Sequence, residues 1–121
     1  MDRKTESMLR TFLESESVRL EAEVEEIDIE GHEALSEASG ENNYRDHMAD
    51  QGTATFSREL DMTLEENVRE ALMAFRRALV RMDEGTYDVC ERCGGPIGEE
   101  RLKAMPTATM CITCKAAEES R

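Results

Sequence analysis

The sequence predicts a mainly α-helical protein, in which a long antiparallel coiled-coil hairpin precedes a small module held by four cysteines. Two long segments repeat apolar residues every three or four positions, which is typical of amphipathic helices. Four cysteines form two close pairs near the C-terminus, and only three Phe, two Tyr and no Trp are present to fill a broad core. We therefore expect a hairpin over residues 1–85 and a separate module over residues 86–121.

The first helix is predicted from about Thr5 to Leu35. Its apolar residues recur at helical spacing and form a narrow stripe: Leu9, Leu13, Leu20, Val24, Ile27 and Leu35. Gly31 weakens such a helix but need not end it. Glutamate and aspartate cover the other faces, and we interpret most of them as a solvated surface.

The second helix is predicted from about Thr53 to Glu84. Its stripe is stronger than that of the first helix: Phe56, Leu60, Leu64, Val68, Ala71, Leu72, Phe75, Leu79 and Met82. Thr63 resembles a capping residue, but the stripe runs through it without a break, so we place it inside the helix. Gly85 supplies a C-terminal stop. Since neither helix can bury its stripe alone, the two should pair antiparallel.

The connection between the two helices covers residues 36–52 and is acidic. Helix–helix connections usually need only about 2–8 residues, so this one is longer than closure of a hairpin requires. Loops of this length tend to be functional or disordered. We therefore expect the tip of the hairpin, rather than its sides, to carry a functional site.

The segment after Gly85 has a different character, with turn-forming glycine and proline residues. We expect short strands at Thr86–Val89 and Thr107–Met110, and a short C-terminal helix from Ile112 to about Glu119. The cysteines lie within this segment, as Cys90-x2-Cys93 and Cys111-x2-Cys114 with 17 residues between the pairs.

This spacing predicts a C4 zinc finger that holds one structural zinc ion. Zinc prefers four ligands in a tetrahedron, and two CxxC turns supply two thiolates each. A redox dithiol or disulfides are the competing interpretations, but a thioredoxin-type CxxC belongs in a βαβ setting that the sequence lacks. The histidines, His32 and His47, are both far from the cysteines in the sequence. A closed shell of four cysteines leaves no position for a reacting water, so we expect no catalysis at the metal.

The formal net charge is −13, and most of it lies in the first half of the chain. Residues 1–52 hold 15 acidic and 5 basic side chains, whereas residues 86–121 hold 6 acidic and 5 basic ones. Direct binding to DNA or RNA is disfavoured, because phosphate backbones require clustered Lys and Arg. A partner with a basic cleft fits better. No signal peptide or membrane-spanning stretch is apparent, so we expect a cytoplasmic protein in which the thiols stay reduced.

The run from Gly85 to Cys114 resembles the DksA/TraR family of C4-type zinc-finger transcription factors. The matching motifs are Gly85-Thr86-Tyr87, Cys90-x-x-Cys93-Gly94, Ile97, Arg101-Leu102-x-Ala104-x-Pro106 and Cys111-Ile112-x-Cys114, preceded by Ala78-Leu79-x-Arg81-Met82. The resemblance implies direct binding to bacterial RNA polymerase, with the coiled coil inserted in the secondary channel and no contact with DNA. It also implies regulation of initiation, for some members together with the alarmone ppGpp.

The tip departs from the family pattern Asp-x-x-Asp-x-Ala. Asp50 matches the second Asp, His47 takes the place of the first with Asp46 one residue earlier, and Gly52 replaces the Ala. This variant resembles a sporulation- and stress-associated branch from Gram-positive bacteria, and it implies partner contacts at these four residues. The alternative is that Asp46 and Asp50 are solvated loop acids, or that Asp50 caps a helix, and that His47 is simply exposed. Two loop acids alone make a weak magnesium site, and we predict none.

Three other functions stay open from the residues alone. One is a zinc-stapled interaction or self-association module with a different partner. A transcript-cleavage cofactor is a second alternative, although no nucleophile–base pair or open metal site supports intrinsic enzyme activity. A DNA-binding zinc finger is the third, and the lack of basic excess in residues 86–121 weakens it.

Overall fold

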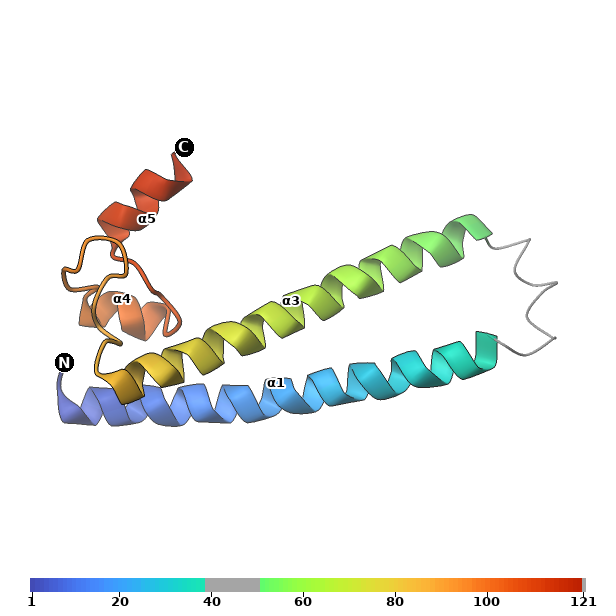
Figure 1. Cartoon of the computed structure of the whole chain (residues 1–121), viewed down its shortest axis with the longest axis horizontal. Coiled ribbons are helices and arrows are strands. Elements are labelled where there is room, and N and C mark those ends of the chain that lie inside the picture. The colour runs from blue at the N-terminus through green and yellow to red at the C-terminus, as the bar shows by residue number, and fades with distance from the viewer. Residues whose placement is uncertain (39–50, 121) are drawn as a thin grey trace. The chain divides into compact units, whose positions relative to one another are not determined.

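A computed structural model describes residues 1–38 and 51–120 of the chain, with side chains described at residues 1–30 and 58–120. This part contains four helices: α1 (Arg3–Ala38), α3 (Gln51–Glu84), α4 (Glu99–Ala104) and α5 (Ile112–Glu119) (Figure 1). The mainly helical prediction is confirmed. None of the helices described is both long and apolar enough to cross a membrane.

Helices α1 and α3 match the two predicted long helices; α1 begins two residues earlier and ends three residues later than predicted, and α3 begins two residues earlier. Gly31 lies inside α1 and Thr63 inside α3, as the sequence indicated. Helix α3 ends at Gly85, whose φ of 79° is favourable only for glycine. The Gly85 amide donates to the Met82 carbonyl (3.2 Å) and the Thr86 amide donates to the Arg81 carbonyl (2.9 Å). These two bonds form a Schellman motif, which satisfies the last carbonyls of the helix.

The two long helices pair antiparallel. Side-chain pairs between them include the ring pair Phe12–Phe75, with centroids 6.1 Å apart, and the ion pairs Arg10–Asp83 and Asp28–Arg69. As the residue number on α1 rises in these pairs, the number of its partner on α3 falls. The two helices therefore run in opposite directions. The chain divides into two compact units, which we call the cysteine unit (Met1–Val18 with Leu72–Arg121) and the helical unit (Arg19–Ala71). Each unit contains a portion of both helices.

The cysteine unit has a continuous apolar core. Its buried members come from α1, α3, α4 and the cysteine-bearing loops: Leu9, Leu13, Ala78, Met82, Tyr87, Cys90, Ile97, Leu102 and Ala108. Leu13 and Leu102 have no exposed surface. Helix α4, which the sequence analysis did not predict, exists because Leu102 on its inner face packs into this core. The module after Gly85 and the adjoining ends of α1 and α3 therefore share one core.

The helical unit is packed more thinly. Leu20 is the one buried side chain among its described residues, and Val24, Ile27 and Val68 are half-buried. The predicted stripe is wrong at Leu60 and Leu64, which are 50% and 53% exposed. On α1, Ile29 is likewise 53% exposed. Apolar spacing along a helix therefore does not by itself produce burial in this unit.

The two predicted strands are absent from the described residues. The Val89 amide donates to the Thr86 carbonyl (3.1 Å), which makes Thr86–Val89 a turn rather than an extended segment. Val89 pairs with Pro96 in an isolated antiparallel bridge. The amide of Ala108 likewise donates back to Met105 (3.0 Å). The chain must curve to bring each cysteine pair to a common point, and this curvature excludes a longer ladder.

Candidate metal centre

The two cysteine pairs are presented by different kinds of local structure. Cys90 and Cys93 lie in a tight loop, where the Cys90 amide donates to the Gly95 carbonyl (2.8 Å) and the Gly94 amide donates to the Cys90 carbonyl (3.0 Å). Gly94 has a φ of 74°, so the turn after Cys93 requires glycine. Cys111 is the N-cap residue of α5 and Cys114 lies in its first turn. A helix start thus presents the second pair.

The four sulfur atoms converge as the sequence predicted. Their Sγ atoms all lie within 4.8 Å of one another, and those of Cys93 and Cys111 are 3.9 Å apart. Zinc–sulfur bonds of about 2.3 Å in a tetrahedron place sulfurs about 3.8 Å apart, so the donor set fits zinc. The cysteines form no disulfide. The residues that would hold the ion are Cys90, Cys93, Cys111 and Cys114, and their thiolates close the shell to solvent-derived ligands.

Backbone amides prepare these sulfurs for a cation. The Cys93 amide, the strongest influence on Cys90, lowers the pKa of the Cys90 thiol to about 6. In the same way the Cys114 amide lowers the pKa of the Cys111 thiol. A hydrogen bond to the neighbouring Cys111 sulfur, together with desolvation, favours the protonated form and raises the pKa of the Cys114 thiol to about 12. Full ionisation of all four thiols therefore needs a positive charge among them, which a zinc ion supplies.

Burial is uneven around the site. Cys90 is 1% exposed and belongs to the apolar core, whereas Cys93 is exposed and the second pair is half-buried. Beside the core, the phenol of Tyr87 donates to the Pro106 carbonyl (2.7 Å), which ties the first cysteine loop to the segment before the second pair. The metal centre thus sits at the edge of the cysteine unit, with one ligand inside its core.

Three arginines near the cysteines were missed as part of the site by the sequence analysis. Arg81 and Arg101 donate to backbone carbonyls just before the first cysteine of each pair, and Arg92 donates to the Cys114 carbonyl (3.3 Å). Arginine is usually a surface residue, so composition gave no reason to place these side chains at a metal site. The one available signal was that Arg81 and Arg101 fall inside the motifs quoted for the family resemblance.

The structure does not test the predicted tip residues. Asp46, His47 and Asp50 lie outside the described residues. Gly52 falls in the first turn of α3, at a point where the structure describes only the backbone. Their role stays a prediction.

The chain is similar to known proteins. Residues 85–120 match the model of the prokaryotic dksA/traR C4-type zinc finger. The RNA polymerase-binding transcription factor DksA of Caulobacter vibrioides is 34% identical over 97 residues, which cover 80% of this chain and 68% of that protein. The chain belongs to the DksA/TraR family. Within the family, the four cysteines are a C4 zinc finger that binds one structural zinc ion.

Two further proteins are similar to this chain over different lengths. General stress protein 16O of Bacillus subtilis is 44% identical over 89 residues, which are 72% of this chain and 55% of that protein. The chain therefore aligns with only about half of that relative. The solved structure of transcription factor DksA2 from Pseudomonas aeruginosa matches all of this chain and 88% of its own, with a TM-score of 0.77 and 31% identity. The helical hairpin and the cysteine module both belong to this shared DksA/TraR fold.

Proposed function

We propose that this DksA/TraR protein is a transcription regulator that binds bacterial RNA polymerase directly. The observation that carries the proposal is the match of the whole chain to the DksA2 transcription factor, hairpin and zinc module together. Several sequence relatives are named RNA polymerase-binding transcription factors, and the name of another relative supports a role in stress. A long helical hairpin on a zinc-folded module is the common architecture.

The finer part of the proposal is the mode of binding. The hairpin enters the secondary channel of the polymerase, where its acidic tip, Asp46 to Gly52, approaches the active centre. The charge distribution supports this arrangement, because the first 52 residues hold 15 acidic side chains against 5 basic ones and a basic channel attracts them. The protein acts in the cytoplasm, where the polymerase is found.

The zinc module is expected to support the hairpin without contacting DNA. Residues 86–121 carry 5 basic and 6 acidic side chains, and four zinc-bound thiolates add further negative charge. Binding to a phosphate backbone releases counterions only where Lys and Arg cluster, and this segment has no basic excess. A salt-dependent gel shift with duplex DNA would contradict this part of the proposal.

The first experiment measures retention of core polymerase. The zinc-loaded full chain is immobilised and exposed to purified core RNA polymerase from Bacillus subtilis at low and moderate salt. Retention at moderate salt is expected, and salt should weaken it because opposite charges steer the association. Failure to retain polymerase at both salt concentrations would remove the polymerase function and favour an interaction module with another partner. The zinc centre and family membership do not depend on this result.

The second experiment separates binding from action at the tip. Asp50→Asn should leave polymerase affinity within about twofold but reduce the effect on initiation in vitro, because the tip acid acts after docking. Asp61→Asn is the matched control, since it removes the same charge from an exposed position on α3. Equal activity of Asp50→Asn and wild type would remove the tip from the mechanism. Parallel reactions with and without ppGpp test the alarmone, and a backtracked complex tests transcript cleavage.

A further inference from the structure

The residues just before each cysteine pair are held in the same way. Val89 precedes Cys90 and accepts a hydrogen bond from Arg81, and Met110 precedes Cys111 and accepts one from Arg101. We propose that Arg81 and Arg101 are positioning residues of the zinc centre, each of which orients one cysteine pair for the metal. The proposal concerns zinc binding and does not rest on the polymerase function.

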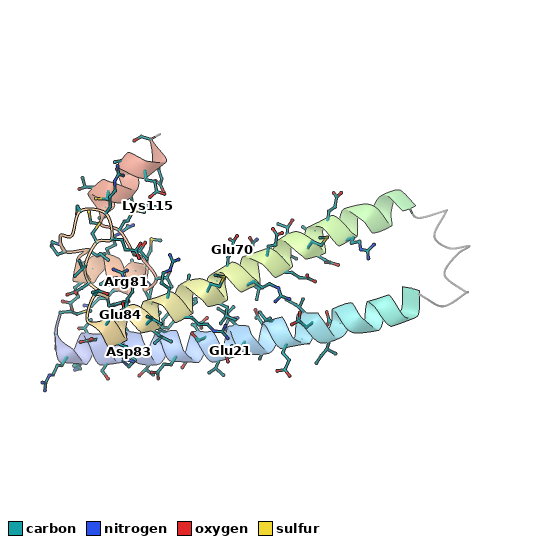
Figure 2. The ribbon with its side chains drawn as sticks, in the orientation of Figure 1. Glu21, Glu70, Arg81, Asp83, Glu84 and Lys115 are labelled. Carbon is teal, nitrogen blue, oxygen red and sulfur yellow. The ribbon has the colours of Figure 1, made fainter. Side chains whose placement is uncertain are left out.

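Arg81 makes the more extensive contacts. It lies in the last turn of α3, where its side chain is labelled in Figure 2, and only 7% of the residue is exposed. Its guanidinium donates to the carbonyls of Thr86 (2.9 Å), Val89 and Ala108 (3.4 Å). The first two carbonyls lie on the loop that leads to Cys90, and the third lies three residues before Cys111. One side chain therefore bonds both segments that deliver cysteines.

The backbone of Arg81 is also hydrogen-bonded to the loop that leads to Cys90. Its carbonyl accepts the Thr86 amide in the Schellman motif that ends α3. Thr86 is thus fixed to Arg81 through both its amide and its carbonyl. The exit from α3 and the path to the first cysteine are set by a single residue.

Arg101 provides the corresponding contact for the second pair from α4. Its Nε donates to the Met110 carbonyl at 2.9 Å, and the residue is half-buried. Helix α4 is anchored in the core by the adjacent Leu102, which has no exposed surface. The anchor holds the guanidinium in place, so the unpredicted helix has a function at the metal centre.

Fixing a carbonyl fixes the cysteine that follows it. The peptide group is planar, so the Val89 carbonyl, the Cys90 amide and the Cys90 Cα lie in one plane, and the same holds for Met110 and Cys111. Restraining that plane restricts where the Cβ and Sγ of the cysteine can point. Groups that orient ligands in this way commonly change metal affinity by about 10- to 100-fold when they are removed.

Charge favours the same arrangement. Four thiolates around a zinc dication carry a net charge of about −2. The bonds that the structure describes for the Arg81 guanidinium all go to carbonyl oxygens, and a buried arginine without a counter-charge is unfavourable. The neighbouring Tyr87 does not supply one, because burial raises the pKa of its phenol to about 12. A zinc–thiolate centre that includes Cys90, the residue after Val89, would supply negative charge close to the Arg81 guanidinium.

The test compares Arg81→Met, Arg101→Met and the control Arg77→Met, which removes the same charge from an exposed position on α3. Zinc affinity is measured on the full chain by competition with a chromogenic chelator. We expect a loss of about 10- to 100-fold for Arg81→Met, a smaller loss for Arg101→Met, and a change within about twofold for Arg77→Met. Arg81→Lys should retain more zinc affinity than Arg81→Met but less than wild type. An ammonium group cannot place its N–H donors as the planar guanidinium does, on several separate carbonyls.

A second readout distinguishes positioning from general loss of stability. Under limiting chelator, cysteines are alkylated and the order of modification is read by mass spectrometry. Cys111 and Cys114 should react first in Arg101→Met, and Cys90 and Cys93 first in Arg81→Met. Cobalt-substituted protein should show altered ligand-field bands in both variants and unaltered bands in Arg77→Met.

Two results would overturn the proposal. Zinc affinity within about twofold of wild type in both variants would show that the arginines do not act on the metal. Uniform alkylation of all four cysteines in each variant, with unaltered cobalt spectra, would show that the side chains stabilise the fold alone. If Arg81→Met does not fold with zinc present, Arg101→Met decides the question by the same measurements.

Discussion

The cysteine unit and the helical unit contain portions of the same two helices, yet they are held together differently. The cysteine unit buries a cluster contributed by α1, α3, α4 and the loops, and the zinc ligand Cys90 is a member of that cluster. Among the described side chains of the helical unit only Leu20 is buried, and Asp28–Arg69, an ion pair between its two helices, is exposed. Helix continuity does not confer equal stability along a hairpin: the metal and the core stabilise one unit only.

Removal of zinc should have the largest effect, and it should destabilise the cysteine unit far more than the helical unit. Structural zinc in small modules contributes on the order of 10 kcal/mol, so a strong chelator should abolish protection from hydrogen exchange over residues 86–120. Peptides from residues 58–68 of α3 should change much less, because they belong to the helical unit. Hydrogen exchange with mass spectrometry checks both regions in one experiment, and re-addition of zinc is the control. Unchanged protection over residues 86–120 after complete zinc loss would contradict the expectation.

Two leucine truncations compare the units directly. Leu13→Ala should lower the free energy of unfolding by about 2–5 kcal/mol, because it opens a cavity at a side chain with no exposed surface. Leu64→Ala, at a 53% exposed position of α3, should change it by less than about 0.5 kcal/mol. Urea unfolding of zinc-loaded protein, followed by circular dichroism, gives both values. Similar losses for the two variants would show that the hairpin is packed uniformly.

Alkaline pH should weaken the cysteine unit through Tyr87. Burial raises the pKa of the Tyr87 phenol from 10.0 to about 12, although the nearby Arg81 acts in the opposite direction. The stabilisation is fully present below about pH 10 and is lost as the pH rises towards about 12, because the unfolded chain releases the proton first. Unfolding free energies at about pH 9 and 11 should differ by about 1–2 kcal/mol more in wild type than in Tyr87→Phe. An identical pH dependence in the two proteins would exclude this role for Tyr87.

The smallest effect is expected from the ion pair of the helical unit. Asp28→Asn removes the partner of Arg69, but both side chains are about half exposed, so the loss should be about 0.2–1 kcal/mol. The effect should shrink further at high salt. Asp83→Asn, which removes the partner of Arg10 in the cysteine unit, is the matched variant. A loss above about 2 kcal/mol for Asp28→Asn would mean that the helical unit depends on this pair.

Much of the fold and of the metal centre could be predicted from the sequence, and the parts that were missed have physical causes. Helix periodicity and Gly85 located α1, α3 and the end of α3, and cysteine spacing located the metal centre, because these signals are local. The exposure of Leu60 and Leu64 was not predictable from their own helix, because burial depends on neighbouring elements and not on spacing within one helix. Ser17 illustrates the same limit: it is buried between Leu13 and Leu20 without a described partner, although its residue type excluded it from the predicted stripe.

The errors near the metal have a different origin. Thr86–Val89 and Thr107–Met110 have residue types that favour strands, but Thr86–Val89 forms a turn and a second turn, Met105–Ala108, overlaps the start of the other segment. Helix α4 is only six residues long, too short to show a clear period, and it depends on the burial of Leu102. The role of Arg81 was invisible for a related reason, because only the folded chain shows that a charged residue of α3 bonds the carbonyls of distant loops. The tip residues stay a prediction on which the described structure does not bear.

Helix α5 shows what the metal contributes beyond holding four sulfurs. It has eight residues and no buried side chain, whereas isolated helices shorter than about 12–15 residues are marginal in water. Its N-cap is Cys111 and its first turn contains Cys114, so zinc fixes the residues whose ordering is the unfavourable step of helix nucleation. The amount of helix formed over α5 should therefore report the fraction of the protein that holds zinc. Any partner that recognises this helix would distinguish the zinc-loaded protein from a chain that has its hairpin but not its ion.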